Sequence, residues 1–165
     1  MILGLSIQGF TLLHVIISLI AIVSGFIVLG GMFGSRRLPG WTALFLLTTV
    51  LTSVTGFMFP GTTLTPARIF GIISLVVLVP AFIALYVFRL RGAWRWIYVG
   101  GAVIALYLNV FVLVVQSFEK IPVLEPLAPT QSEPPFLASE IFVLVIFTLL
   151  GIAALVKFHP ARNPI

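Results

Sequence analysis

Polar side chains that could bind a ligand or move a proton are few in this chain, and they lie within or beside long apolar stretches. His14 carries an imidazole and Glu140 a carboxyl group, so the two could form an acid–base pair if their segments were neighbours. Asn109, Gln116 and Lys120 differ by 7 and 4 positions, which places them on one face of a helix. The candidate ligand-binding residues are His14, Thr52, Asn109, Gln116, Lys120, Gln131, Glu133 and Glu140.

Catalytic and cofactor chemistry find little support in the same residues. The chain has no cysteine and no aspartate, and its serines lack a flanking nucleophile motif. Haem b usually needs two axial ligands. Because His159 lies in the C-terminal tail, only His14 with Met58, or His14 from two chains, could supply them. We therefore expect no catalytic residue, no metal site and no cofactor.

Five long apolar stretches must position these side chains. They cover residues 7–33, 40–59, 66–88, 95–118 and 136–157. Each is long enough to cross a bilayer core, which needs about 20 residues of helix. The sequence thus predicts an all-α integral membrane bundle of five transmembrane helices in a single domain, residues 1–165.

Composition supports a membrane location. Hydrophobic residues make up 61% of the chain and charged residues 8%, whereas roughly a quarter of residues in soluble domains are charged. Nine Lys and Arg against four acidic residues give a net charge of +5. Because the basic residues sit beside the ends of the apolar stretches, we interpret them as topology signals and lipid headgroup contacts, and we expect no nucleic-acid partner.

The basic residues also predict an orientation, because seven of them fall on one side of the predicted bundle and two on the other. Cytoplasmic loops carry the excess of positive charge, so we expect the N-terminus outside and the C-terminus in the cytoplasm. Tryptophan rings, which prefer the membrane interface, mark the same inner boundary. The seven are Arg36, Arg37, Arg89, Arg91, Arg95, Lys157 and Arg162, the two are Arg68 and Lys120, and the tryptophans are Trp41, Trp94 and Trp96.

Prolines and small residues predict where the helices start, bend and approach one another. Thr65 followed by Pro66 is typical of an N-cap with proline at the first helical position. Pro80 predicts a kink near residues 76–80. Gly101 with Ala105 places two small residues on one helix face, so a second helix can come close there.

The external connection 119–135 is too rich in proline for a regular helix. Its apolar residues predict that it folds back onto the mouth of the bundle. Long connections of this kind are often functional or else disordered, so a lid or docking surface and an inert linker both remain open. The apolar residues are Ile121, Val123, Leu124, Leu127 and Phe136.

The candidate polar side chains share one depth, the outer half of the predicted bundle. His14, for example, lies about seven residues below the outer end of its helix, roughly 10 Å. Polar groups that face lipid are costly, so we expect these to face the bundle interior. They could line a pocket capped by the proline-rich connection, or they could hydrogen-bond between helices as packing contacts.

Residues 109–118, NVFVLVVQSF, and 127–136, LAPTQSEPPF, together with His14, Arg36-Arg37 and Trp41, resemble a pattern found in small bacterial multi-span inner-membrane proteins. Such families carry no settled activity. The resemblance therefore implies a bacterial inner membrane and no particular reaction. The resemblance implies that the first candidate functional positions are Asn109, Gln116, Lys120, Thr130, Gln131 and Glu133.

These observations together favour a non-catalytic binding or accessory protein of the membrane. Its pocket is expected in the external half of the bundle and would take a small, partly apolar molecule or a lipid. The alternative is a structural subunit of a larger membrane complex, with another membrane protein as the partner. A small transporter or a haem-binding redox protein has less support, since no acidic residue lies deep in a span and only one histidine lies inside one.

Overall fold

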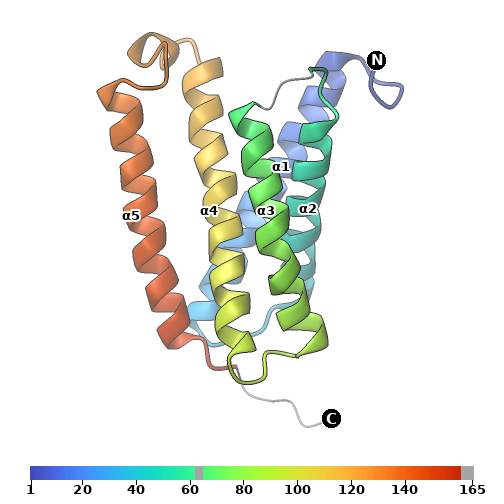
Figure 1. The fold of residues 1–165 in the computed structure, drawn as a ribbon, viewed down its shortest axis with the longest axis vertical. Coiled ribbons are helices and arrows are strands. Elements are labelled where there is room, and N and C mark those ends of the chain that lie inside the picture. Colours follow the sequence, from blue (N-terminus) through green and yellow to red (C-terminus); the bar gives the residue numbers. More distant parts are fainter. Residues whose placement is uncertain (62–64, 161–165) are drawn as a thin grey trace.

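The computed structural model describes residues 1–61 and 65–160, so Arg162 lies outside the described residues. Within them the chain is all-α, and five helices are long and apolar enough to cross a membrane (Figure 1). A short π-helix, η1, continues α3, and a short 3-10 helix, η2, lies between α4 and α5. The bounds are α1 Ile7–Phe33, α2 Pro39–Phe57, α3 Pro66–Phe82, η1 Ile83–Val87, α4 Trp94–Lys120, η2 Glu125–Leu127 and α5 Pro134–Lys157.

Consecutive helices run in opposite directions and form one bundle (Figure 1). Helix α1 packs against α2, α4 and α5, while α4 packs against α3 and α5. We call the end with the α1–α2 connection, the η1–α4 connection and residues 158–160 the basic end. We call the opposite end, with the N-terminus and the connection from α4 to α5, the loop end. The two ends differ in charge, and this difference matters for the site.

Local sequence explains where the helices begin. Proline occupies the start of α2, α3 and α5, where its fixed φ is suitable and its missing N–H leaves no helical bond unmade. The Thr65 side chain accepts a hydrogen bond from the Arg68 N–H at 3.4 Å, which confirms the predicted N-cap. The Ser6 hydroxyl caps α1 in the same way, 3.1 Å from the Gly9 nitrogen.

A π-helical turn follows the α-helix of the third span just after Pro80, and the kink expected near residues 76–80 stays a prediction. The α-helix continues to Phe82, and a π-helical turn then covers Ile83–Val87, in which the Phe88 N–H donates to the Ile83 carbonyl oxygen at 3.0 Å. Wide turns of this kind often occur at functional sites. Here the turn carries Leu85 and Tyr86 into the wall of a cavity.

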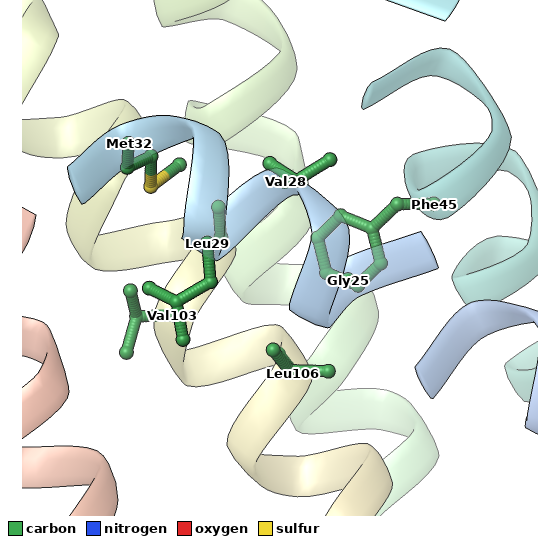
Figure 2. Close-up of a pocket in the computed structure, with 8 residues that line it drawn as sticks. Gly25, Val28, Leu29, Met32, Phe45, Val103 and Leu106 are labelled. Carbon is green, nitrogen blue, oxygen red and sulfur yellow. The ribbon is translucent and has the colours of Figure 1, made fainter. Parts of the chain in front are cut away.

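The helices meet closely where glycine lies at the contact. A Cβ atom on Gly101 of α4 would lie 2.9 Å from the Ala81 Cβ of α3, and one on Gly25 of α1 would lie 2.5 Å from a Leu106 methyl group. Figure 2 shows the tight apolar void beside Gly25, about 10 Å³, between side chains of α1, α2 and α4. A void of this size holds no more than about one water molecule.

Apolar side chains also cover much of the outer surface. On α5, Phe142, Leu149 and Val156 are each more than 60% exposed. A soluble monomer rarely presents apolar surface of this extent, whereas lipid tails solvate it without cost. The exposed apolar faces of the five helices suggest that the bundle is embedded in a lipid bilayer.

Candidate functional site

Two of the predicted polar residues make hydrogen bonds between helices. His14 Nδ1 of α1 lies 2.7 Å from the Thr55 hydroxyl oxygen of α2, and Asn109 Nδ2 of α4 donates to the Thr49 hydroxyl oxygen at 3.1 Å. The Thr55 hydroxyl oxygen also lies 2.7 Å from the Leu51 carbonyl oxygen, so this hydroxyl contacts both its own helix and α1. These pairs act as packing contacts between α2 and its neighbours.

Gln116 and Lys120 share one carboxylate at the end of α4. Gln116 Nε2 donates to Glu119 Oε2 at 2.9 Å, and Lys120 Nζ lies 3.0 Å from Glu119 Oε1. Lys120 and Glu119 are exposed, so this ion pair is screened by solvent and contributes little to stability. The stripe predicted on α4 therefore splits, with Asn109 bonded inside the bundle and the other two residues bonded on its surface.

The predicted residues of the proline-rich connection organise that connection itself. Glu133 accepts hydrogen bonds from the Thr130 N–H at 3.1 Å and hydroxyl at 2.9 Å, and from the Ser132 N–H at 3.0 Å. Desolvation alone would raise the pKa of Glu133, but these hydrogen bonds outweigh it and lower the pKa below its usual value. Gln131 Nε2 donates to the Val115 carbonyl oxygen of α4 at 3.4 Å.

The connection also folds back onto the bundle. Ala128 is buried in one cluster with Phe118 and Phe136, whose rings meet edge to face with centroids 5.6 Å apart. Leu124 packs against this cluster, whereas Ile121, Val123 and Leu127 stay exposed. The expected fold-back thus occurs through some of the predicted apolar residues.

Glu140 and Thr52 stand apart from the other predicted residues. Both Glu140 carboxyl oxygens and the Thr52 hydroxyl are buried and have no hydrogen-bond partner among the described residues. His14 is bonded to Thr55, so no hydrogen bond joins it to Glu140 as an acid–base pair would require. A group of acidic, cysteine or histidine residues that could hold a metal is absent from the described part of the chain.

The larger of the two described cavities lies at the basic end and holds about 550 Å³. Its wall combines guanidinium groups and hydroxyl groups with apolar side chains. The apolar part includes Val28 and Met32, which also line the small void of Figure 2 and close the cavity toward the core. The polar lining residues are Arg36, Arg37, Thr42, Tyr86, Arg89 and Tyr98.

Two tight turns bring the three arginines to this cavity. After α1, Ser35 adopts a left-handed conformation with φ 54°, and the Arg36 N–H donates back to the Gly31 carbonyl oxygen at 2.9 Å. After η1, Arg89 and Leu90 are also left-handed, with φ 49° and 61°. Left-handed φ values are uncommon outside glycine and are often found at binding sites.

The C-terminal segment closes one side of the cavity. Phe158 is 2% exposed, lines the cavity, and places its ring 6.0 Å from the Tyr98 ring. Arg95 donates to the Phe158 carbonyl oxygen, and the His159 N–H donates to the Ser35 hydroxyl oxygen at 2.7 Å. The segment after α5 is therefore tied to the turn after α1 and to the first turn of α4.

The arginines of the cavity have no acidic side chain beside them among the described lining residues. The chain has four acidic residues, and all of them lie in the second half of α4, in the connection that follows, or in the first part of α5. These positions are at the loop end and in the turns of the bundle nearest to it. Among the described residues, the guanidinium groups of Arg36, Arg37 and Arg89 therefore share a region without a glutamate side chain. The acidic residues are Glu119, Glu125, Glu133 and Glu140.

From the sequence, these arginines are interpreted as topology signals and lipid headgroup contacts, and the predicted pocket is placed in the opposite half of the bundle. The available signal was the presence of arginines in both turns, with Tyr86 and Tyr98 on either side of the second turn, but nothing in their spacing shows that the turns meet. No family model, curated protein or solved structure matches this chain. The described fold is a five-helix apolar bundle consistent with a multi-span membrane protein, and no family is assigned.

Proposed function

We propose that this protein is a non-catalytic membrane protein that binds an anionic amphiphile at its basic end. One observation carries the proposal: a cavity of about 550 Å³ lined by Arg36, Arg37 and Arg89, with no acidic side chain among its described lining residues. Guanidinium groups keep their charge at all physiological pH values and bind phosphate or carboxylate oxygens through paired N–H donors. An anion from outside the chain is the natural partner of such a site.

The apolar walls explain why the ligand should also carry a hydrocarbon part. Leu38 and Leu85 line the cavity beside the arginines. Toward the core, Val28 and Met32 separate the cavity from a void of about 10 Å³, which is too small for an alkyl chain (Figure 2). The charged head of the ligand therefore sits in the cavity, and its apolar part lies along the outside of the bundle in the lipid.

The proposed orientation places this site at the cytoplasmic face. The excess of basic residues at this end follows the positive-inside rule. The cytoplasmic leaflet holds anionic lipids, which juxtamembrane basic residues attract. The membrane that we propose is the bacterial inner membrane, in line with the resemblance of residues 109–118 and 127–136 to proteins of that membrane.

This location differs from the outer-half pocket that the sequence favours. The hydrogen bonds of His14 with Thr55 and of Asn109 with Thr49 support a packing role for those residues. A ligand at the outer end stays a hypothesis with less support than one at the basic end. A structural subunit role would use the exposed apolar faces for a partner protein instead of lipid.

Native mass spectrometry of the purified protein tests the proposal. We expect the protein to retain phosphatidylglycerol through detergent exchange in preference to phosphatidylcholine with the same acyl chains. The double variant Arg36→Gln with Arg89→Gln should lose this preference, whereas Arg91→Gln, an exposed arginine outside the cavity lining, should keep it. Equal retention of both lipids by the unaltered protein would refute the proposal.

A further inference from the structure

We infer that the head of the bound molecule is a phosphate monoester rather than a phosphodiester or an amine-bearing headgroup. The inference rests on the proposed function and specifies the chemical class of its ligand. It draws on three features of the cavity: its net charge, its hydroxyl donors and the absence of acidic residues from its lining.

Charge favours the monoester. Arg36, Arg37 and Arg89 bring three positive charges to the cavity, and no lining residue is acidic. A phosphate monoester carries about −1.5 to −2 at pH 7, while a phosphodiester carries a single negative charge. The monoester therefore neutralises more of the cavity's charge, and each bond between a guanidinium and a phosphate oxygen is charge-assisted and strong.

The hydroxyl groups of the lining support the same class. Thr42 and Tyr98 are buried and interact with each other, and Tyr86 contributes a third hydroxyl from the π-helical turn. A monoester presents three terminal oxygens, each able to accept more than one hydrogen bond, whereas a diester presents two. The three acceptor oxygens of a monoester suit a cavity whose lining offers both guanidinium and hydroxyl donors.

The lining also disfavours ammonium-bearing headgroups. Ethanolamine and serine headgroups carry an ammonium group that needs an acceptor or a carboxylate nearby, and the lining residues include no acid. Such a headgroup would bring its ammonium close to guanidinium groups, and like charges at short range oppose binding. Selectivity against these lipids thus follows from the same charge distribution.

The test compares lipids with identical acyl chains and different heads by native mass spectrometry of the full-length protein. Phosphatidic acid should bind at least about ten-fold more tightly than phosphatidylglycerol, because it offers more charge-assisted bonds. Equal affinity for these two lipids would overturn the monoester inference and leave the proposed function in place. Failure of both to bind more tightly than phosphatidylcholine would overturn both.

Two further experiments test whether the headgroup belongs to a lipid and whether hydroxyl donors recognise it. Glycerol 3-phosphate is a soluble monoester without acyl chains, and we expect it to displace phosphatidic acid poorly. If it competes at equal concentration, a soluble monoester is the ligand and the lipid source is wrong. The variant Tyr86→Phe keeps the ring and removes the hydroxyl, so it should reduce the preference for phosphatidic acid, and an unchanged preference would count against the role of the hydroxyl donors.

The pH dependence gives an independent readout. The second pKa of a phosphate monoester is about 6, so the ligand loses negative charge between pH 7 and pH 5 and its binding should weaken. Phosphatidylglycerol keeps a constant charge over this range. The charged or titratable side chains that line the cavity are Arg36, Arg37, Arg89, Tyr86 and Tyr98, and His159 lies beside the turn after α1. The phosphatidylglycerol control reports any pH effect that arises from the protein itself. Tighter binding of phosphatidic acid at pH 5 would contradict the inference.

Discussion

The Arg37 guanidinium donates a hydrogen bond from Nη2 to the main-chain oxygen of Arg89, 3.1 Å away and 52 positions along the chain. This contact joins the turn after α1 to the turn after η1, and both turns line the basic cavity. The geometry of the cavity therefore depends on a side chain that also supplies part of its charge. Arg37 can do both because a guanidinium has five N–H donors.

The first prediction concerns this double role of Arg37. Arg37→Lys keeps the positive charge but replaces the planar guanidinium group by a single ammonium group. The contact to the Arg89 carbonyl oxygen and the binding of the ligand then compete for that one group. We expect a loss of anionic-lipid retention with a small fall in stability, about 0.5–1.5 kcal/mol for the lost hydrogen bond. Native mass spectrometry and thermal unfolding in detergent measure the two effects. Retention equal to that of the unaltered protein would show that charge alone suffices.

The second prediction compares two adjacent glycines of α4. Gly101→Ala would place a Cβ 2.9 Å from the Ala81 Cβ and 3.3 Å from the Val77 carbonyl oxygen, whereas a Cβ on Gly100 meets nothing within 4 Å. We expect Gly101→Ala to lower stability by about 1–3 kcal/mol through overpacking. Gly100→Ala should leave stability unchanged or slightly higher, because alanine favours the helix. Thermal unfolding of both variants decides, and similar unfolding temperatures would argue against close packing of α3 and α4.

The sequence predicted the five apolar helices because each stretch is long, apolar and bounded by proline, glycine or charge. It could not predict the basic cavity. That site depends on left-handed residues at Ser35, Arg89 and Leu90 and on a π-helical turn. These features arise from how the turns pack against Phe158 and each other, and none has a local sequence signature.

The polar residues in the half of the bundle nearer the loop end show the same limit of sequence-based prediction. The seven-residue spacing of Asn109 and Gln116 places both on one face of a helix. This spacing is the same whether the amides line a pocket or bond to a neighbouring helix. The partners decide the role: Thr49 on α2 for Asn109, and Glu119 on the same helix for Gln116. Partner identity requires the register between helices, which hydrophobic periodicity does not supply.

The third prediction separates these two amides. Asn109→Leu leaves the buried Thr49 hydroxyl without its interhelical donor, so stability should fall by about 1–3 kcal/mol. Gln116→Leu removes a contact to an exposed carboxylate and should change stability by less than about 0.5 kcal/mol. Thermal unfolding of both variants in the same detergent provides the comparison. An unaffected Asn109→Leu variant would revive the interpretation of a cavity in the outer half.

The fourth prediction follows from the lowered pKa of Glu133. A carboxyl group whose pKa is lower in the folded state stabilises the fold fully above its unfolded pKa, and this contribution disappears as the pH falls through the folded pKa. The hydrogen bonds to Thr130 and Ser132 should thus open in acid and loosen the connection. Hydrogen exchange of residues 128–133, corrected for intrinsic pH dependence, should rise below about pH 4. In Glu133→Gln, which has no titrating group at this position, the protection should not depend on pH.

The last prediction tests the orientation on which the location of the site depends. The chain contains no cysteine, so a single introduced cysteine reports one position only. Ser132 is exposed in the connection between α4 and α5, and Ala93 is exposed beside the start of α4 at the basic end. In intact cells an impermeant maleimide should label Ser132→Cys and spare Ala93→Cys, and after membrane disruption it should label both. The reverse pattern in intact cells would place the arginine-lined cavity outside, away from the leaflet whose anionic lipids we propose as its ligands.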